Sequence, residues 1–221
     1  MPKKDFSSIP DALSAEYCAA CGGFSWYDFV TAFPSPVFLV TGRKANGKEN
    51  ACLQSWSTFV GEGTENFVCI LGKVYTGGHM YQSLKETGVC VLNFPSLDIY
   101  DRCVKTIGGN QWEADEITAA GLTAEPAAKV NAPRIQECFL NIECEFLWEH
   151  PLLDGGSNMT VALKAVNICM DSERCDHSKL GRYGEQGYLF QIDQPTNPES
   201  GAREPIIGGT ITPFTAPWET T

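Results

Sequence analysis

The chain has 221 residues, of which 43% are hydrophobic and 11% aromatic, and its formal net charge is −11. The apolar content is sufficient for one buried core and excludes wholesale disorder. The negative charge argues against a nucleic-acid-binding protein, which would carry a basic stripe with interleaved aromatic side chains. Ten cysteines without an export signal predict reduced, mostly buried thiols in a cytoplasmic protein. Because the longest apolar stretches are only strand-sized, we predict no membrane span.

The first elements in chain order form an antiparallel meander. Residues 1–34 lack a clear periodicity and are expected to be an extension before the main domain. The β-branched and aromatic run 37–42 is followed by Asn46-Gly47, which predicts a hairpin because both residues tolerate a positive φ. The return strand is predicted over 49–59, and a third strand over 67–71.

The following segment alternates short helices with strands. A helix is predicted over 79–87 with Gly88 as its C-cap, and two further helices over 97–107 and 113–120. Strands are predicted over 89–94, over 140–146, where apolar and acidic residues alternate, and over 159–170. This pattern favours a mainly β domain over 35–192, a small closed or split antiparallel barrel, rather than a doubly wound parallel sheet. The Pro/Gly-rich tail 193–221 is expected to be a loop or an arm.

The common catalytic and nucleotide-binding motifs are missing from the sequence. There is no Walker A sequence, no glycine-rich Rossmann fingerprint, no H-E-x-x-H and no G-x-S-x-G. Cys18-Ala19-Ala20-Cys21 has C-x-x-C spacing but no second ligand pair, so it is interpreted as incidental, and no metal site is predicted.

Six segments in order over residues 36–145 resemble the flavin reductase-like family. They are the hairpin ending in Asn50-Ala51-Cys52, Gln54-Ser55-Trp56-Ser57-Thr58, Lys85-Glu86-Thr87-Gly88, Asn93 with Pro95, Ala119-Ala120-Gly121-Leu122-Thr123, and 130–145. The resemblance implies an FMN-binding split β-barrel, antiparallel and Greek-key-like with a few short helices. It also implies a homodimer.

The same resemblance implies where the flavin would lie. Gln54, Ser55, Trp56, Ser57 and Thr58 fall where members of the family place a segment along the flavin. Trp56 either covers the flavin ring or packs in the core.

The phosphate end and the strand end carry further candidates. Lys73, Thr76 and His79 are candidates for binding the phosphate, because a helix N-terminus beside a cation binds anions. The family usually has Ser or Thr where this chain has Met80, so Thr76, or His79 with the Gly77-Gly78 backbone, would take over. Asn93 ends an apolar strand, where it either contacts the flavin or ties down a neighbouring loop.

The resemblance supplies no acid–base residue, so no catalytic residue is predicted. Hydride would move directly between nicotinamide and flavin, and the protein would supply orientation and electrostatics. The leading hypothesis is therefore an FMN-dependent oxidoreductase that uses NADH or NADPH and passes hydride to a small acceptor or a redox partner protein. The alternatives are a flavoredoxin-type electron carrier without enzymatic activity, and a barrel that has lost its flavin.

Overall fold

The computed structural model describes residues 2–3, 5–9, 25–108, 111–175, 183, 187–192 and 208–211. The chain divides into two compact units, Met1–Ser35 with Gln191–Gly209, and Pro36–Phe190 with Thr210–Thr221. Cys18 and Cys21 lie outside the described residues. The short strands β1 (Ser35–Pro36), β11 (Leu189–Gln191) and β12 (Gly208–Thr210) lie where the chain passes from one unit to the other.

The first unit contains a helix that the sequence did not predict, α2 (Trp26–Thr31). It begins with a capping box, in which the Ser25 hydroxyl accepts from the Tyr27 N–H and the Asp28 carboxylate accepts from the Ser25 N–H. These bonds satisfy backbone donors that a helix N-terminus leaves free. A capping box is a readable sequence signal, but six residues are too few for a helical periodicity.

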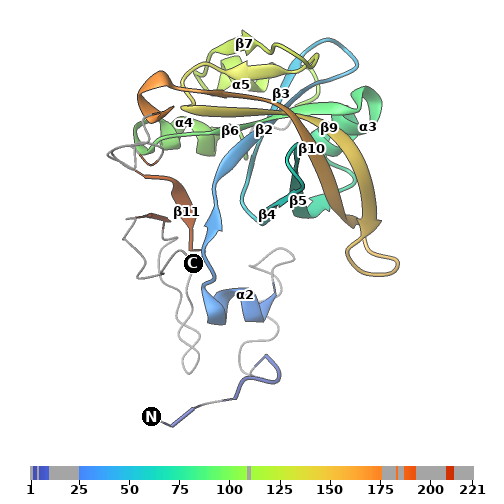
Figure 1. Ribbon diagram of the computed structural model, residues 1–221. Helices are drawn as coiled ribbons and strands as arrows, with labels where there is room; N and C mark the ends of the chain where they lie inside the picture. The colour runs from blue at the N-terminus through green and yellow to red at the C-terminus, as the bar shows by residue number, and fades with distance from the viewer. Residues whose placement is uncertain are drawn as a thin grey trace. The chain divides into compact units, whose positions relative to one another are not determined.

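The second unit is built on a seven-stranded antiparallel sheet in the order β3-β2-β6-β9-β10-β5-β4 (Figure 1). Its strands are β2 (Phe38–Arg43), β3 (Glu49–Gln54), β4 (Ser57–Glu62), β5 (Asn66–Tyr75), β6 (Val89–Phe94), β9 (Leu140–Pro151) and β10 (Asn158–Met170). A separate two-stranded ladder pairs β7 (Ala124–Pro126) with β8 (Pro133–Ile135). The hairpin at Asn46-Gly47 is confirmed, since β2 pairs with β3 in register from Phe38 opposite Gln54 to Arg43 opposite Glu49.

The strands β3 and β4 follow each other in the chain but lie at opposite edges of the sheet. The predicted single strand over 49–59 is therefore wrong, because the chain leaves β3 after Gln54 and starts β4 at Ser57. Between them the Trp56 carbonyl accepts from the Gly72 N–H at 2.8 Å. The break lets the chain pass from one edge to the other, which is how the sheet curls into a barrel with a split between β3 and β4.

The helices cover the β3 side of this sheet. The helix α3 (His79–Thr87) ends as predicted at Gly88, which has a left-handed φ of 71°. It packs against β2 and β3, and the four-residue helix α5 (Glu116–Ala119) packs against β3. The predicted helix over 97–107 is a 3₁₀ turn, η1 (Leu97–Ile99), followed by α4 (Tyr100–Lys105). A second 3₁₀ turn, η2 (Ser172–Cys175), follows β10.

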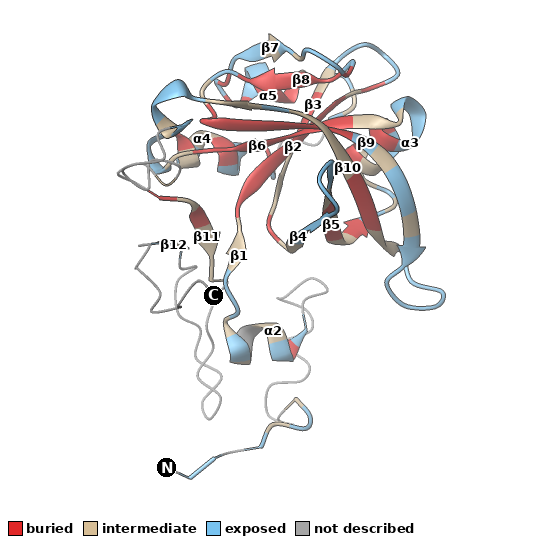
Figure 2. Cartoon of the chain, viewed as in Figure 1, coloured by how far each residue is buried: buried red, intermediate tan, exposed pale blue. Residues whose placement is uncertain are grey.

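The core lies inside the curled sheet, where β2, β6 and the first half of β9 are buried (Figure 2). Phe38 and Leu92 are fully buried there and pack in one cluster with Leu163. The hairpin β9–β10 runs from this core to an exposed tip. The eight described cysteines are free thiols, and burial raises the pKa of Cys69 and Cys138. Within the described residues, no helix has the length and apolar character needed to cross a membrane.

Candidate functional site

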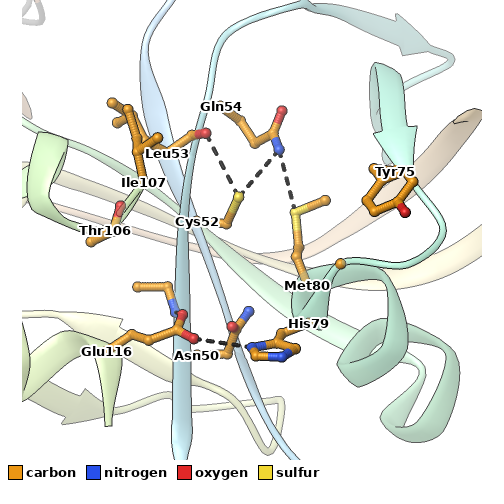
Figure 3. A pocket seen from close by; sticks show the side chains of 12 residues that line it. Asn50, Cys52, Leu53, Gln54, Tyr75, His79, Met80, Thr106, Ile107 and Glu116 are labelled. Carbon is orange, nitrogen blue, oxygen red and sulfur yellow. Dashed lines mark hydrogen bonds and ion pairs between the residues drawn. The ribbon is translucent and has the colours of Figure 1, made fainter. Parts of the chain in front are cut away.

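A cavity of about 160 Å³ opens beside the edge strand β3 (Figure 3). Its wall comes from strand β3, the end of β5, the start of helix α3, the two residues that follow α4, and helix α5. The lining residues are Asn50, Ala51, Cys52, Leu53, Gln54, Tyr75, Gly78, His79, Met80, Thr106, Ile107 and Glu116.

The outer edge of β3 presents backbone hydrogen-bonding groups to this cavity. The Ala51 N–H donates to Glu116 Oε2 at 3.0 Å, so it points away from the partner strand β2. In an antiparallel ladder, alternate residues point their N–H and C=O groups to the same side. The N–H and C=O of Leu53 therefore face the same outer edge as those of Ala51, and the edge offers a donor and acceptors to a bound molecule.

The side chains at the upper end of the cavity are soft and weakly polar. The Gln54 amide donates to Cys52 Sγ at 3.4 Å and to Met80 Sδ at 3.8 Å. Sulfur is a weak acceptor, so the Gln54 amide can exchange these bonds for stronger ones to a ligand oxygen. Burial raises the pKa of Cys52, which keeps this side chain a neutral thiol.

The N-terminus of α3 lies next to the same cavity. Its N-cap is Gly78, which has no side chain to cap the first N–H groups. A Cβ on Gly77 would lie 2.7 Å from the ring of the exposed Tyr75, so a side chain at this position would require the Tyr75 ring to move. Uncapped N–H groups and the helix dipole make such a terminus suitable for an anion or a carbonyl oxygen.

A buried ion pair forms the other end of the cavity. Lys44 Nζ lies 2.8 Å from Glu116 Oε1, and the Lys44 side chain is fully buried. The ammonium also donates to the carbonyl oxygens of Gln111, Trp112 and Ala114, at 3.1, 3.3 and 2.9 Å. Lys44 therefore fixes the segment that leads into α5 and compensates the charge of Glu116.

Glu116 connects this ion pair to the cavity wall. Its Oε1 lies 3.3 Å from His79 Nδ1. The Asn50 amide nitrogen, turned towards the carboxylate, donates to Oε2 at 2.7 Å and to Oε1 at 3.3 Å. The rings of His79 and Trp112 pack edge to face, with 5.1 Å between their centroids.

The structure brings two of the predicted site residues, Gln54 and His79, to the cavity wall. The other members of the 54–58 segment form the crossing between β3 and β4: Ser55 is buried, the Ser57 hydroxyl donates to the Ser55 carbonyl at 3.0 Å, and Thr58 is exposed. Thr76 is half-buried, and its hydroxyl donates to the Ser157 carbonyl at 3.1 Å.

Two further predicted site residues, Lys73 and Trp56, are in contact with each other. Lys73 Nζ is 4.9 Å from the centroid of the Trp56 ring. Lys73 has a left-handed φ of 52°, and the pairing of β5 with β10 is irregular at this point. The bulge therefore places a cation beside Trp56, in the segment predicted to run along the flavin.

Asn93 is the one predicted site residue whose surroundings contradict a ligand contact. It is fully buried on β6, and its amide nitrogen donates to the Leu39 carbonyl and to the Thr41 hydroxyl. Its Oδ1 accepts from the Ile135 N–H and from Asn141, both at 2.9 Å. Since these bonds use both ends of the amide, Asn93 ties β8 to the sheet, which was the alternative interpretation.

The sequence did not single out Lys44 or Glu116, and it noted Asn50 only as part of a motif. Lys44 follows β2 in a predicted turn, where a lysine is ordinarily solvated. Glu116 stands in the first turn of a short helix, where an acidic residue complements the helix dipole. Only the packing of α5 on β3 brings these side chains together.

The curled antiparallel sheet, split between its edge strands, defines a split-barrel protein, and solved structures share this fold. A flavin reductase with a split barrel domain from Shewanella frigidimarina has a TM-score of 0.71 at 14% identity, covering 97% of this chain and 100% of that one. Nitrilotriacetate monooxygenase component B from Bacillus cereus has a TM-score of 0.71 at 16% identity, with the same coverage of 97% and 100%. Flavoredoxin of Desulfovibrio vulgaris has a TM-score of 0.64 at 17% identity, covering 83% and 90%.

Residues 30–184 match the flavin reductase like domain, and the chain therefore belongs to that family. A curated protein from Methanothermobacter thermautotrophicus, described as uncharacterized, is 32% identical over 63 residues. That match covers 28% of this chain and 30% of the relative, so it spans less than a third of the relative's length.

Proposed function

We propose that this chain is an FMN-dependent oxidoreductase that accepts hydride from NADH or NADPH and passes the electrons to a small acceptor or a redox partner protein. The observation that carries the proposal is the cavity along the outer edge of β3, next to the uncapped start of α3. Membership of the flavin reductase-like family makes a flavin the expected occupant.

The residues around the cavity fit an FMN molecule. The isoalloxazine ring needs hydrogen-bond donors and acceptors at its polar edge, and the Leu53 backbone, the Gln54 amide and His79 offer both kinds. The phosphate needs donors or a cation, which the N-terminus of α3 and Lys73 provide. FMN would supply the redox chemistry, and the protein would orient the ring and set its electrostatic surroundings.

The alternative function is that of a flavoredoxin-type electron carrier. Proteins whose printed names are flavoredoxin, from Desulfovibrio vulgaris and Methanosarcina acetivorans, share this fold with TM-scores of 0.64 and 0.66. A carrier needs only an exposed ring edge, whereas a reductase must leave one ring face open to nicotinamide. The cavity volume of about 160 Å³ favours partial enclosure of a ring and is compatible with both functions.

One pair of experiments tests the proposal. The purified protein is expected to be yellow, or to turn yellow with added FMN, at about one FMN per chain by analysis of the released cofactor. Under anaerobic conditions NADH or NADPH is expected to bleach the bound flavin. Protein that binds no FMN contradicts the proposal, and bleaching by dithionite but by neither nucleotide favours the electron carrier.

We also propose that the chain forms a homodimer. Four large apolar side chains of the β9–β10 hairpin are exposed in the single chain: Leu147, Trp148, Leu152 and Leu153. Exposed apolar patches of this kind commonly mark interfaces. Light scattering at micromolar concentration is expected to give the mass of two chains, and Leu153→Glu with Leu147→Glu is expected to give the mass of one. A stable monomer of the unaltered protein contradicts the proposal.

A further inference from the structure

The helix α4 and the residues next to it carry apolar side chains on two faces. The inner face presents Ile99, from the preceding turn η1, and Cys103, which are buried and belong to the same core cluster. The helical turn continues past the end of α4, because the Ile107 N–H donates to the Val104 carbonyl at 3.1 Å. Thr106 in this turn is also buried. The spacing of four and then three residues from Ile99 to Thr106 is that of one helical face.

The outer face of the same segment is apolar as well. Leu97, Val104 and Ile107 are exposed by 56%, 41% and 64%, although each has a large apolar side chain. They are separated by seven and three residues, a spacing that places them along one side of a helix. Single exposed apolar residues are normal on a protein surface, but three at helical spacing form a stripe that favours an interaction. We call Leu97, Val104 and Ile107 the α4 stripe.

The α4 stripe ends at the cavity beside β3. Its last residue, Ile107, lines that cavity together with Thr106 (Figure 3). A molecule that binds to the stripe would therefore reach the rim of the site in which we propose the flavin. A small electron acceptor needs only the cavity, whereas a protein acceptor needs a surface beside it. Weak complexes between redox proteins use small interfaces that combine an apolar centre with a charged rim.

The charges next to the α4 stripe are mainly negative. Asp98 and Asp101 are exposed carboxylates on the polar side of the helix, and Lys105 is an exposed cation there. Arg102 lies on the same side, but its charge is balanced by Glu137, with 3.2 Å between Nη1 and Oε1. Because the whole chain also has a formal net charge of −11, this surface attracts a basic partner and repels an acidic one.

We propose that the α4 stripe is the docking surface for a basic redox protein that takes electrons from the flavin in the cavity beside β3. This inference rests on the proposed function and narrows it, since it selects a protein acceptor over a small one. In the step itself the reduced flavin is oxidised by two electrons and releases its protons to solvent, and two one-electron acceptors are each reduced once. The apolar side chains supply the contact, and the carboxylates beside them steer the partner towards it.

Electron transfer to a basic c-type cytochrome tests the apolar part of this surface. FMN-loaded protein is reduced anaerobically with dithionite, freed of excess reductant and mixed rapidly with the oxidised cytochrome, and the second-order rate constant is measured. Val104→Ser is expected to lower this constant about threefold to fivefold, the scale of one lost apolar contact. The matched control is Val60→Ser on β4, at a valine that is 49% exposed, and it is expected to leave the constant unchanged. Reduction of benzoquinone, a small uncharged acceptor, is expected to be equal in all three proteins.

The same assay at several salt concentrations tests the charged part of the surface. The rate constant of the unaltered protein is expected to fall about tenfold from low salt to about 0.3 M salt, because salt screens the attraction. Asp101→Lys is expected to lower the constant at low salt by about tenfold and to flatten this salt dependence. Glu65→Lys makes the same change of charge at an exposed position of the β4–β5 turn, and it is expected to have a much smaller effect.

The outcomes separate this inference from the proposed function. Val104→Ser and Asp101→Lys proteins that transfer electrons to the cytochrome no more slowly than their two controls overturn the inference, and Asp101→Lys decides it alone if Val104→Ser fails to fold. Conversion of a dimer to a monomer by Val104→Ser, seen in light scattering, also overturns it, because the α4 stripe would then bind a second copy of the chain. In each of these cases bound FMN leaves the proposed function standing. Protein that binds no FMN contradicts the proposed function, and the docking proposal then fails with it.

Discussion

The second unit buries two carboxylates beside basic partners, Glu143 on β9 and Glu116 on α5. They differ in whether a side chain that contacts the carboxylate also lines the cavity beside β3. Glu143 is completely buried and accepts from Arg134, from the Ala128 and Lys129 N–H groups and from Asn167. These bonds tie the segment before β8 to β9 and β10. Arg134 lies on β8, Asn167 on β10, and Ala128 and Lys129 in the loop between β7 and β8. We call this cluster closed because none of these residues lines the cavity beside β3.

The Glu116 cluster is similarly buried but ends at a cavity. Its last member, His79, is half-buried and lines the space beside β3. A buried ion pair alone is weak evidence for function, because desolvation offsets much of its attraction. What distinguishes Glu116 is that it contacts His79, a side chain that lines the cavity. The predictions below test this difference.

The largest effect on stability is expected from removing the Glu143 carboxylate from its cluster. Glu143→Ala removes the buried partner of Arg134, which keeps only the exposed Glu125, and leaves two backbone N–H groups without an acceptor. The free energy of unfolding is therefore expected to fall by about 3–5 kcal/mol. Urea denaturation measures it, with Glu145→Ala at an exposed position of the same strand as the control. The FMN dissociation constant of the folded protein is expected to stay unchanged, and a large change in it would contradict a purely structural role.

Acid is expected to open the same cluster without a mutation. Burial raises the pKa of Glu143, but the Ala128 N–H, Arg134, Asn167 and the Lys129 N–H outweigh it and lower the pKa from 4.5 to about 2. Because the pKa is lower in the folded state, the stabilisation is complete above about pH 4.5 and is lost as the pH falls towards 2. It amounts to about 3 kcal/mol. Urea denaturation across this range is expected to show a smaller loss in Glu143→Gln than in the unaltered protein.

A mutation in the Glu116 cluster is expected to lower both the stability of the protein and its affinity for flavin. Lys44→Met keeps the length of the buried stem but leaves Glu116 without its cation, at a cost of about 2–3 kcal/mol in unfolding free energy. Unlike Glu143→Ala, it is also expected to weaken FMN binding, because His79 lines the cavity and the Glu116 carboxylate that holds it loses its own anchor. Unchanged flavin binding by folded Lys44→Met protein would show that the two clusters do not differ in function.

The smallest effect is expected at the split between β3 and β4. Lys73→Ala is expected to weaken FMN binding by about 1–2 kcal/mol, the scale of one charge-assisted hydrogen bond, and to leave riboflavin binding unchanged. Isothermal titration with both flavins measures this, and Lys48→Ala, an exposed lysine of the β2–β3 turn, is the control. Equal losses for both flavins would place Lys73 at the ring instead of the phosphate.

The sequence by itself determined the features that depend on neighbouring residues. Asn46-Gly47 specified the first hairpin and Gly88 ended α3, because Gly47 and Gly88 adopt a positive φ that few residues tolerate. Alternation over 140–146 identified part of β9, and the ordered motifs identified the family. The family in turn pointed to Gln54 and His79, both of which line the cavity.

Only the tertiary structure decided how distant side chains meet. No local pattern shows that β3 and β4 lie at opposite edges of one sheet, or that the chain must break at Ser55-Trp56 to reach both. The environments of Lys44 and Glu116 arise from the packing of α5 on β3, and that of Asn93 from the approach of β8 to β6. The residue type alone does not reveal whether a lysine, glutamate or asparagine lies on the surface or in the core. Burial and partners, which are set by long-range contacts, determine what such a side chain does.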